Sequence, residues 1–589
     1  MTLKAYTEID NIRNDMHQAR RLHVPKWQSI SEYISPHRYK NGQEERNQGQ
    51  RKDHKIIKNE AGLALRTFVS GMMNGATSRV RPWWRFTTLN KKIRNLPEVK
   101  RYFSECEEII NAYFEVSNLY RVLPSSYKDL GLFSNSAFAM LPDPKTGFYF
   151  YPFAVGTYSI GTDHKSQTNS FSRDFTLTIR QVIHKYGKLK ENGHLDLSEM
   201  DPYVARLWKE SRYEETVVLN NTILPNDRPK ENPLFARDKL FQSYTYIRSA
   251  QGNLPPQSPT GFAQRMGSIS GMGTGPNSGV FLSIRGYDYF PIIAPRWEVM
   301  PEDDYGVDGP GDLAIGYVKG LQEKEAYRLE AIAKLVKPPM IGPAQLRRHQ
   351  ASILAGGITY FDESDRGTFK PAFQVDPRLN DLVNSQLEDE QKIGSCFFKD
   401  LFLMLAQDKP TSHVTAREIE ERAAEKLQAI APVLGQVDDD QNAPIIGNAY
   451  LLLNQMGKLP QPPKIMEGEA IQPEYISVLA QASKASMMNS AERAVNFTVS
   501  ASEALGDPTL IQLMDGEELV RRYTDWVGLD PNLIKTKKEF EVVRQAAQQA
   551  AQQQQQMAMQ QQQAATAKDL SQAKVSGDSL LDNVMQGQQ

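Results

Sequence analysis

The residues of this sequence that could carry chemistry form no recognisable catalytic pattern. The chain has no GxxxxGK(S/T) phosphate-binding loop, no HExxH zinc motif and no GxSxG nucleophile elbow. Its nine histidines show no ligand spacing, and its two cysteines, Cys106 and Cys396, lie far apart without a CxxC pair. We therefore expect no enzymatic activity, no cofactor and no metal ion.

Three consecutive aspartates, Asp438, Asp439 and Asp440, are the most metal-like group in the sequence. Carboxylates bind cations, but successive side chains cannot readily converge on one ion. We therefore expect residues 438–445 to form a solvated acidic loop.

A polar loop, AQDKPTSHV at 406–414, separates two predicted helices. The first begins with Asp376-Pro377, an N-cap followed by proline, and its apolar stripe predicts one helix as far as residue 405. The second begins at Thr415 with the capping box TARE. On its residues alone, the loop is as readily an ordinary αα-hairpin connection as a functional element.

The longest predicted helix covers residues 312–336, between Gly309-Pro310-Gly311 and Pro338-Pro339. It would be a rod of roughly 38 Å. Its apolar stripe comprises Ala314, Val318, Leu321, Leu329, Ile332 and Val336. Because only one side is apolar, the rod must pack sideways against something similar.

The remaining periodicity predicts a mainly α protein with a smaller α+β part. Before the long helix, Trp83 and Trp84 in the stretch RVRPWWRF predict a large aromatic core anchor. Residues 251–279, rich in Gly, Pro and Ser, predict a mobile loop. The further elements are helices at 11–34, 57–76, 97–119, 124–136, 176–186 and 197–212, and strands at 138–158, 214–221, 240–248, 280–285 and 290–299.

Composition limits the class of protein. The formal net charge is −1, whereas tight nucleic-acid binders usually carry a basic excess. A channel through which DNA slides is still compatible with this balance. The sequence shows no apolar run long enough for a membrane helix and no signal-peptide core, and its cysteine usage indicates folding in a reducing cytoplasm.

Three stretches together resemble the head-to-tail connector (portal) proteins of short-tailed, podovirus-type bacteriophages. They are the long helix between its GPG turn and KPP, the RPWW segment after a small-residue helix, and VTAREIEERAAEKLQAIAPVLG at 414–435. The resemblance spans roughly residues 10–540 in the family's order. The insertion at 251–279 and the glutamine-rich tail are departures from the family pattern.

The resemblance implies a portal fold in a homo-oligomeric ring, and it identifies the loop before the TAREI helix as the tunnel loop. The candidate channel-facing groups are then Lys409, Thr411, Ser412 and His413.

The resemblance also implies the order of the domains. They are an N-terminal wing (1–196), a first stem helix (197–213), a clip (214–305) with a disordered insertion (251–279), a second stem helix (306–339), a wing return (340–465) with the tunnel loop 406–414 and a long kinked helix, a crown (466–540) and a glutamine-rich helical barrel or disordered tail (541–589).

The resemblance also implies the function. A homododecamer at one capsid vertex would conduct double-stranded DNA during packaging and ejection, as part of the virion made in the host cytoplasm. Its expected partners are the terminase large subunit, the major capsid and scaffolding proteins, and the head-tail adaptor or tail proteins, with no membrane. Two alternatives stay open: a ring-forming scaffold or adaptor that conducts no DNA, and a monomeric nucleic-acid enzyme.

Overall fold

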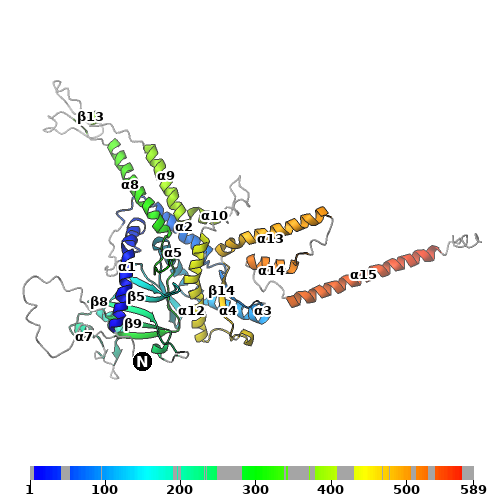
Figure 1. The fold of residues 1–589 in the computed structure, drawn as a ribbon, viewed down its shortest axis with the longest axis horizontal. Helices are drawn as coiled ribbons and strands as arrows, with labels where there is room; N and C mark the ends of the chain where they lie inside the picture. Colours follow the sequence, from blue (N-terminus) through cyan, green and yellow to red (C-terminus); the bar gives the residue numbers. More distant parts are fainter. Residues whose placement is uncertain are drawn as a thin grey trace, which may run out of the picture. The chain divides into compact units, whose positions relative to one another are not determined.

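The chain forms two compact units in the computed structural model, one comprising residues 1–90 and 102–491 and the other 91–101 and 492–589. Figure 1 labels their helices and strands. The structure describes residues 6–40, 53–94, 96–189, 195–196, 200–230, 233, 235–247, 281–336, 340–341, 370–371, 379–406, 430–466, 468–476, 478–505, 513–527 and 537–573. Helices dominate these residues and strands form a smaller part, as the sequence predicts.

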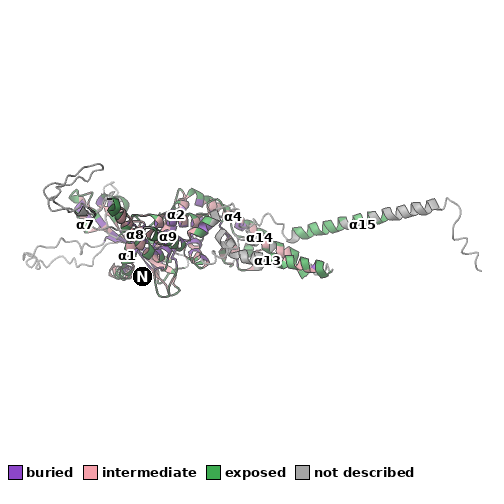
Figure 2. Cartoon of the chain, turned by 90° about the horizontal axis from the view of Figure 1, so that it is seen from above, coloured by how far each residue is buried: buried purple, intermediate pink, exposed green. Residues whose placement is uncertain are grey.

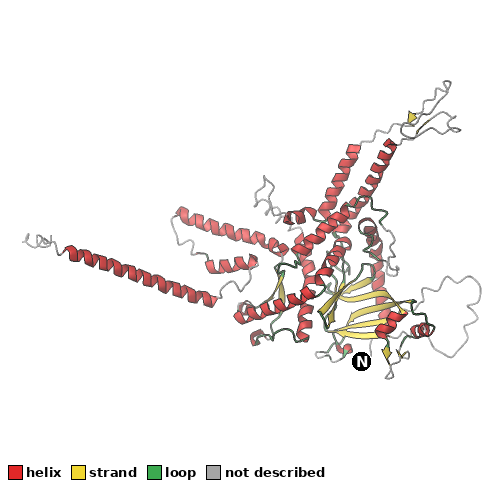
Figure 3. Cartoon of the chain, turned by 180° about the vertical axis from the view of Figure 1, so that it is seen from behind, coloured by secondary structure: helices red, strands yellow, loops and turns green. Residues whose placement is uncertain are grey.

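A five-stranded antiparallel sheet belongs to the first unit (Figure 3). Its order is β10–β9–β8–β5–β4, with bounds Phe281–Tyr287, Phe241–Ile247, Thr216–Pro225, Thr168–Thr178 and Tyr158–Thr162. Helices α6 (Ile179–Tyr186) and α7 (Pro202–Lys209) share one apolar cluster with β8 and β9. Thr178 and Gln181 form a capping box that starts α6 directly at the end of β5.

Helix α1 (Tyr6–Ile34) is joined to this sheet by a buried ion pair. The Arg13 Nη2 atom donates to Asp174 Oδ2 on β5 at 2.6 Å, and Asn220 Nδ2 on β8 donates to Asp174 Oδ1 at 2.8 Å. Burial opposes ionisation of Asp174, but the Arg13 guanidinium holds the pKa of this carboxyl below its ordinary value. Removing either charge would leave the other buried and unpaired, which is strongly destabilising.

A second, three-stranded sheet has the order β11 (Ile292–Ile293), β2 (Phe138–Asp143) and β3 (Gly147–Pro152). Helix α5 (Leu119–Phe133) contacts β3 and also contacts α1, α2 (Glu60–Gly75) and α8. Most of its side chains are buried, so α5 forms the middle of the helical layer.

The predicted tryptophan anchor is confirmed. Trp83 and Trp84 are both buried, and their rings meet edge to face at 6.2 Å between centroids. Strand β1 (Trp84–Thr88) pairs antiparallel with β14 (Ile471–Tyr475), which places Trp84 opposite Tyr475. The strands predicted from periodicity include neither β1 nor β14, so the structure alone reveals this pairing.

Helices α8 (Pro310–Val336) and α9 (Leu379–Cys396) form an antiparallel hairpin that projects from the rest of the first unit (Figures 1 and 3). Beyond their far ends, β12 (Met340–Ile341) pairs with β13 (Lys370–Pro371). The helix that runs along α8 is therefore α9, whereas residues 202–209, within the predicted first stem helix, lie in α7.

The remaining described elements complete the two units. Helix α13 (Val478–Leu505) runs from the first unit into the second, which also contains α3 (Lys91–Arg94), α14 (Gly516–Val527) and α15 (Lys537–Ala573). Residues 539–550 of α15 are all exposed (Figure 2). The first unit also contains most of α4 (Pro97–Val116), α10 (Lys399–Ala406), α12 (Ala443–Gln455), β6 (Lys188–Leu189), β7 (Leu195–Asp196) and the short helical turns η1 (Ala236–Asp238) and η4 (Lys464–Met466).

Two further sequence predictions need correction. The helix predicted from 376 to 405 is interrupted at Phe398, whose φ of 54° lies in the left-handed region and separates α9 from α10. The predicted acidic loop is helical: Asp438–Asn442 form a π-helical turn that continues into α12. The insertion at 251–279 lies outside the described residues. Within the part of the chain that is described, no helix is long and apolar enough to cross a membrane.

Candidate functional site: the helical hairpin and its base

The hairpin begins where the chain before α8 meets the end of α5. Ser134 ends α5 in the left-handed conformation, with φ of 61°. Its hydroxyl donates to Asp312 Oδ2 at 2.6 Å and accepts from Gly309 N at 3.0 Å. Asn135 accepts from Gly306 N at 2.6 Å. These polar side chains therefore provide hydrogen-bond partners for backbone N–H groups and a carboxylate at the start of α8.

Three glycines allow this approach. A Cβ atom at Gly306 would lie 2.4 Å from the Ser134 carbonyl oxygen, and one at Gly311 would lie 2.3 Å from the Leu132 carbonyl oxygen. At Gly309 it would lie 2.5 Å from the Ser134 hydroxyl. The glycines of the GxxGPG pattern at the start of α8 thus form a contact surface, because a side chain at these positions would push α8 away from α5.

Charged and aromatic groups from α1 also hold the base. Lys26 Nζ lies 2.7 Å from Asp312 Oδ2. The Tyr305 ring contacts Trp27 edge to face at 5.3 Å, and its hydroxyl accepts from Ile160 N at 3.2 Å. Burial raises the pKa of Tyr305 to about 12, so this phenol stays protonated.

Polar contacts join the two helices of the hairpin. Lys324 Nζ on α8 donates to Ser385 Oγ and Asp389 Oδ2 on α9, both at 2.7 Å. Gln386 Nε2 donates to Glu325 Oε2 at 3.0 Å. A seam of hydrogen-bonded charges fixes the register of two helices more specifically than apolar contact alone.

Gln322 attaches the hairpin to the segment before α2. Its Oε1 accepts from Ile57 N at 2.7 Å and from Lys58 N at 2.9 Å, and its Nε2 donates to the Lys58 carbonyl at 2.8 Å. One buried amide side chain therefore satisfies three backbone groups of the neighbouring segment.

Helix α10 leads directly to the segment in which the candidate channel residues lie. The Phe402 ring occupies the space over Gly71 of α2, where a Cβ atom would lie 2.0 Å from the ring. Lys399 Nζ lies 2.6 Å from Glu60 Oε1. These two contacts dock α10 on α2 and so fix the point from which the following residues depart.

The sequence-predicted site residues, Lys409, Thr411, Ser412 and His413, lie outside the described residues, as does most of the TAREI helix. Their assignment to the tunnel loop stays a prediction.

The acidic stretch has a structural role that the sequence did not reveal. Asp440 Oδ2 accepts from Arg296 Nε at 2.9 Å, and the Arg296 Nη2 atom donates to the Ser166 carbonyl at 2.6 Å. Arg296 is almost fully buried, so it needs this carboxylate. Among the described residues there is no cluster of three or more potential metal ligands. Asp440 therefore joins the chain after β11 to the turn before α12.

The chain matches one family model over residues 6–254 and 272–534, that of the bacteriophage head to tail connecting protein. The chain belongs to this family.

Two curated relatives match nearly the whole chain. The portal protein of Salmonella phage epsilon15 is 30% identical over 556 residues, which is 94% of this chain and 93% of that protein. The probable portal protein of Bordetella phage BPP-1 is 28% identical over 560 residues, covering 95% of this chain and 94% of that protein. Membership of the head-to-tail connecting family, together with these full-length matches, gives the chain a portal function.

Among solved structures, a chain of a native gene transfer agent virion aligns with 74% of this chain and 85% of its own length, at 10% identity and a TM-score of 0.32. A similarity at this level carries no argument about the arrangement of the domains.

We expect Gly311→Ala to destabilise the protein by about 1–3 kcal/mol, because its methyl group cannot fit against the Leu132 carbonyl without moving α8. Thermal unfolding of the two proteins measures the difference. Gly447→Ala is the control, since Gly447 lies in α12 and a Cβ atom there meets nothing within 4 Å. That control should be neutral or slightly stabilising. Equal melting temperatures for Gly311→Ala and the wild type would contradict the contact.

Asp438 predicts a pH dependence. Burial raises the pKa of this carboxyl to about 7; the hydrogen bond from Asn442 lowers this pKa, and the negative charge of Asp439 raises it. The folded chain therefore keeps a proton on Asp438 that the unfolded chain releases above about pH 4. Stability therefore falls as pH rises from about 4 to about 7.

We expect Asp438→Asn to melt at a higher temperature than the wild type at pH 8, and the difference to shrink toward pH 5. Melting curves across this range provide the measurement. Glu388→Gln, which removes a carboxylate at an exposed position of α9, is the control. A difference that does not vary with pH would argue against a titrating Asp438.

Proposed function

We propose that the chain assembles into a closed ring at one vertex of the capsid, with a central channel for double-stranded DNA. The observation that carries this proposal is the projecting hairpin of α8 and α9. Among the described residues, contacts around Ser134 and Gln322 attach its base to the body.

Both helices of the hairpin expose large apolar side chains. Leu313 and Tyr327 on α8, and Val383 and Leu387 on α9, are all exposed. Such side chains favour burial against a neighbouring element. Side-by-side copies would place α8 of one subunit against α9 of the next, and such a head-to-tail contact closes into a ring when its rotation divides a full turn.

We propose that α8 and α9 are the two stem helices. The clip then belongs to residues 337–378, which join the far ends of the hairpin, and not to residues 214–305 as the sequence suggests. The paired strands β12 and β13 support this assignment because they lie at the distal end of the stem. The five-stranded sheet with its α6 and α7 cover then becomes part of the wing.

The ring would nucleate head assembly, dock the terminase large subunit at its clip and later hold adaptor or tail proteins. It would contact the major capsid and scaffolding proteins in the virion. An overall charge near zero suits a channel for DNA, since strong phosphate binding would slow a sliding duplex.

Class-averaged electron micrographs and light scattering of the purified chain test the ring. We expect a closed ring with a central hole, and the number of subunits can be counted from its symmetry. A nuclease and ATPase assay on the same preparation tests the enzyme alternative, for which we expect no turnover.

We expect Lys409→Ala combined with His413→Ala to leave the ring intact and to lower the amount of DNA packaged or retained several-fold, because a positive contact to phosphate is lost in every subunit. Packaged DNA per particle is the measurement. Lys464→Ala, at an exposed lysine of η4, is the control. Normal packaging by the double variant would remove these residues from the channel.

A further inference from the structure

An exposed tip lies between α2 and β1. The Ser78 hydroxyl accepts hydrogen bonds from Val80 N at 3.3 Å and Arg81 N at 3.4 Å, which fold residues 78–81 into a tight turn. Thr77 and Trp83 are buried on either side of this turn. The Val80 side chain at the apex is 91% exposed. The buried residues on either side of the turn therefore fix an aliphatic side chain in a solvent-exposed position.

Two arginines flank the exposed valine. Arg79 is occupied within its own chain, because its Nη2 atom lies 2.6 Å from Glu115 Oε2 and its guanidinium lies over the Tyr120 ring at 5.9 Å. The exposed Arg81 guanidinium has no ion-pair partner in the described part of the chain. The tip therefore presents an apolar side chain beside a free positive charge.

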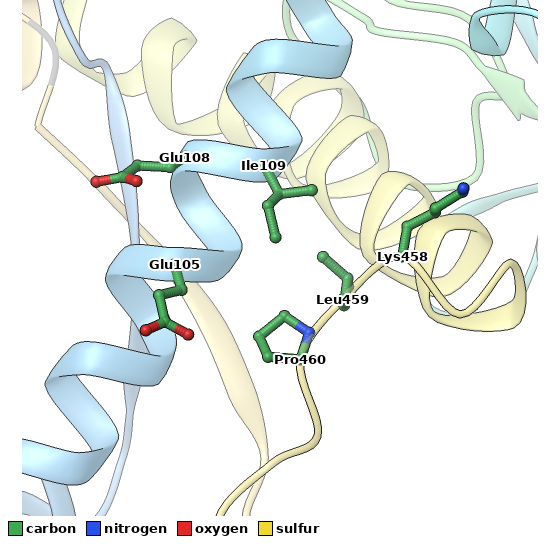
Figure 4. Close-up of a pocket in the computed structure, with 6 residues that line it drawn as sticks. All are labelled: Glu105, Glu108, Ile109, Lys458, Leu459 and Pro460. Carbon is green, nitrogen blue, oxygen red and sulfur yellow. The ribbon is translucent and has the colours of Figure 1, made fainter.

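A hollow of complementary character lies between α4 and the segment that follows α12 (Figure 4). It is open to solvent and has a volume of about 470 Å³. Ile109, Leu459 and Pro460 form its apolar surface, with Glu105 and Glu108 on the α4 side. The Lys458 ammonium group points away from these two carboxylates (Figure 4). The hollow thus suits an aliphatic side chain that is followed by a cation.

The tip and the hollow lie on different sides of α4. Glu107 Oε1 accepts from Phe86 N at 2.6 Å, so one side of α4 faces β1, the strand into which the tip leads. Ile109 is two residues further along the helix and therefore lies about 160° around it from Glu107. Two complementary surfaces at different places on one subunit make head-to-tail contacts, which generate a ring when the rotation between subunits closes.

We propose that Val80 of one subunit inserts into the hollow of the next, with Arg81 against Glu108. This contact rests on the proposed ring and adds a second set of residues to it, distinct from the stem hairpin. The hollow is larger than a valine side chain, so the aliphatic stem of Arg81 also lies within it and leaves its charge at the rim.

A charge exchange tests the pairing. Arg81→Glu and Glu108→Arg should each weaken ring assembly at least about fivefold, since a favourable charge pair becomes repulsive at every subunit boundary. The double variant, with both changes, should recover assembly because opposite charges face each other again. The concentration at which rings appear in light scattering is the measurement. Normal assembly by both single variants, or no recovery in the double variant, overturns the pairing.

Disulfide trapping tests the same contact independently of stability. In a chain whose native Cys106 and Cys396 are both replaced by Ala, the double variant Val80→Cys with Pro460→Cys should give a ladder of cross-linked chains on oxidation, whereas each single variant gives at most dimers. Leu89→Cys with Pro460→Cys is the matched control, because Leu89 is also exposed near β1 but lies outside the tip. A ladder from the control, or none from the test pair, overturns the proposal.

The two experiments separate this contact from the proposed function. Rings in the wild type with no ladder from the Val80 and Pro460 pair refute the contact and leave the ring standing. A wild type that forms neither rings nor ladders refutes both.

Discussion

The close approach of the α8 start to the α5 end is the constraint on which the rest of the first unit depends. At Gly306 and Gly311 the two backbones meet with no room for a side chain, and Ser134 supplies hydrogen bonds across the contact. Because close packing transmits small displacements, an error of one methyl group here would alter the direction of the whole hairpin. The glycine-rich turn at residues 306–311 therefore sets the position of the hairpin.

Buried charge pairs fix the layers around this contact. Arg13 with Asp174 joins α1 to the five-stranded sheet, and Arg296 with Asp440 joins the chain after β11 to the turn before α12. Each pair connects segments far apart in sequence. Such pairs contribute little net stability compared with apolar replacements, but they penalise any packing that separates them. They select one arrangement among several that an apolar core would accept.

Local patterns predicted local structure well. The stripe of Ala314, Val318 and Leu321 predicted the long helix, and the stretch predicted as strand at 138–158 contains the hairpin of β2 and β3. What periodicity does not contain is the partner of each element. The Asp438 turn was read as solvated because its partner, Arg296, lies 144 positions away from Asp440, and the partner of α8 proved to be α9. The candidate channel residues came from family resemblance alone, since no local pattern distinguishes a loop that lines a channel from an ordinary connection.

The pairing of β1 with β14 has a consequence for biosynthesis. Trp84 is made early and its strand partner Tyr475 very late, so a nascent chain must hold an unpaired, tryptophan-bearing strand throughout most of translation. Contacts of such long sequence separation form slowly, and the exposed strand is prone to aggregation while it waits. The same delay acts as a checkpoint, because truncated chains lack β14 and cannot complete the first unit. Only subunits synthesised beyond Tyr475 would then reach the assembly pathway.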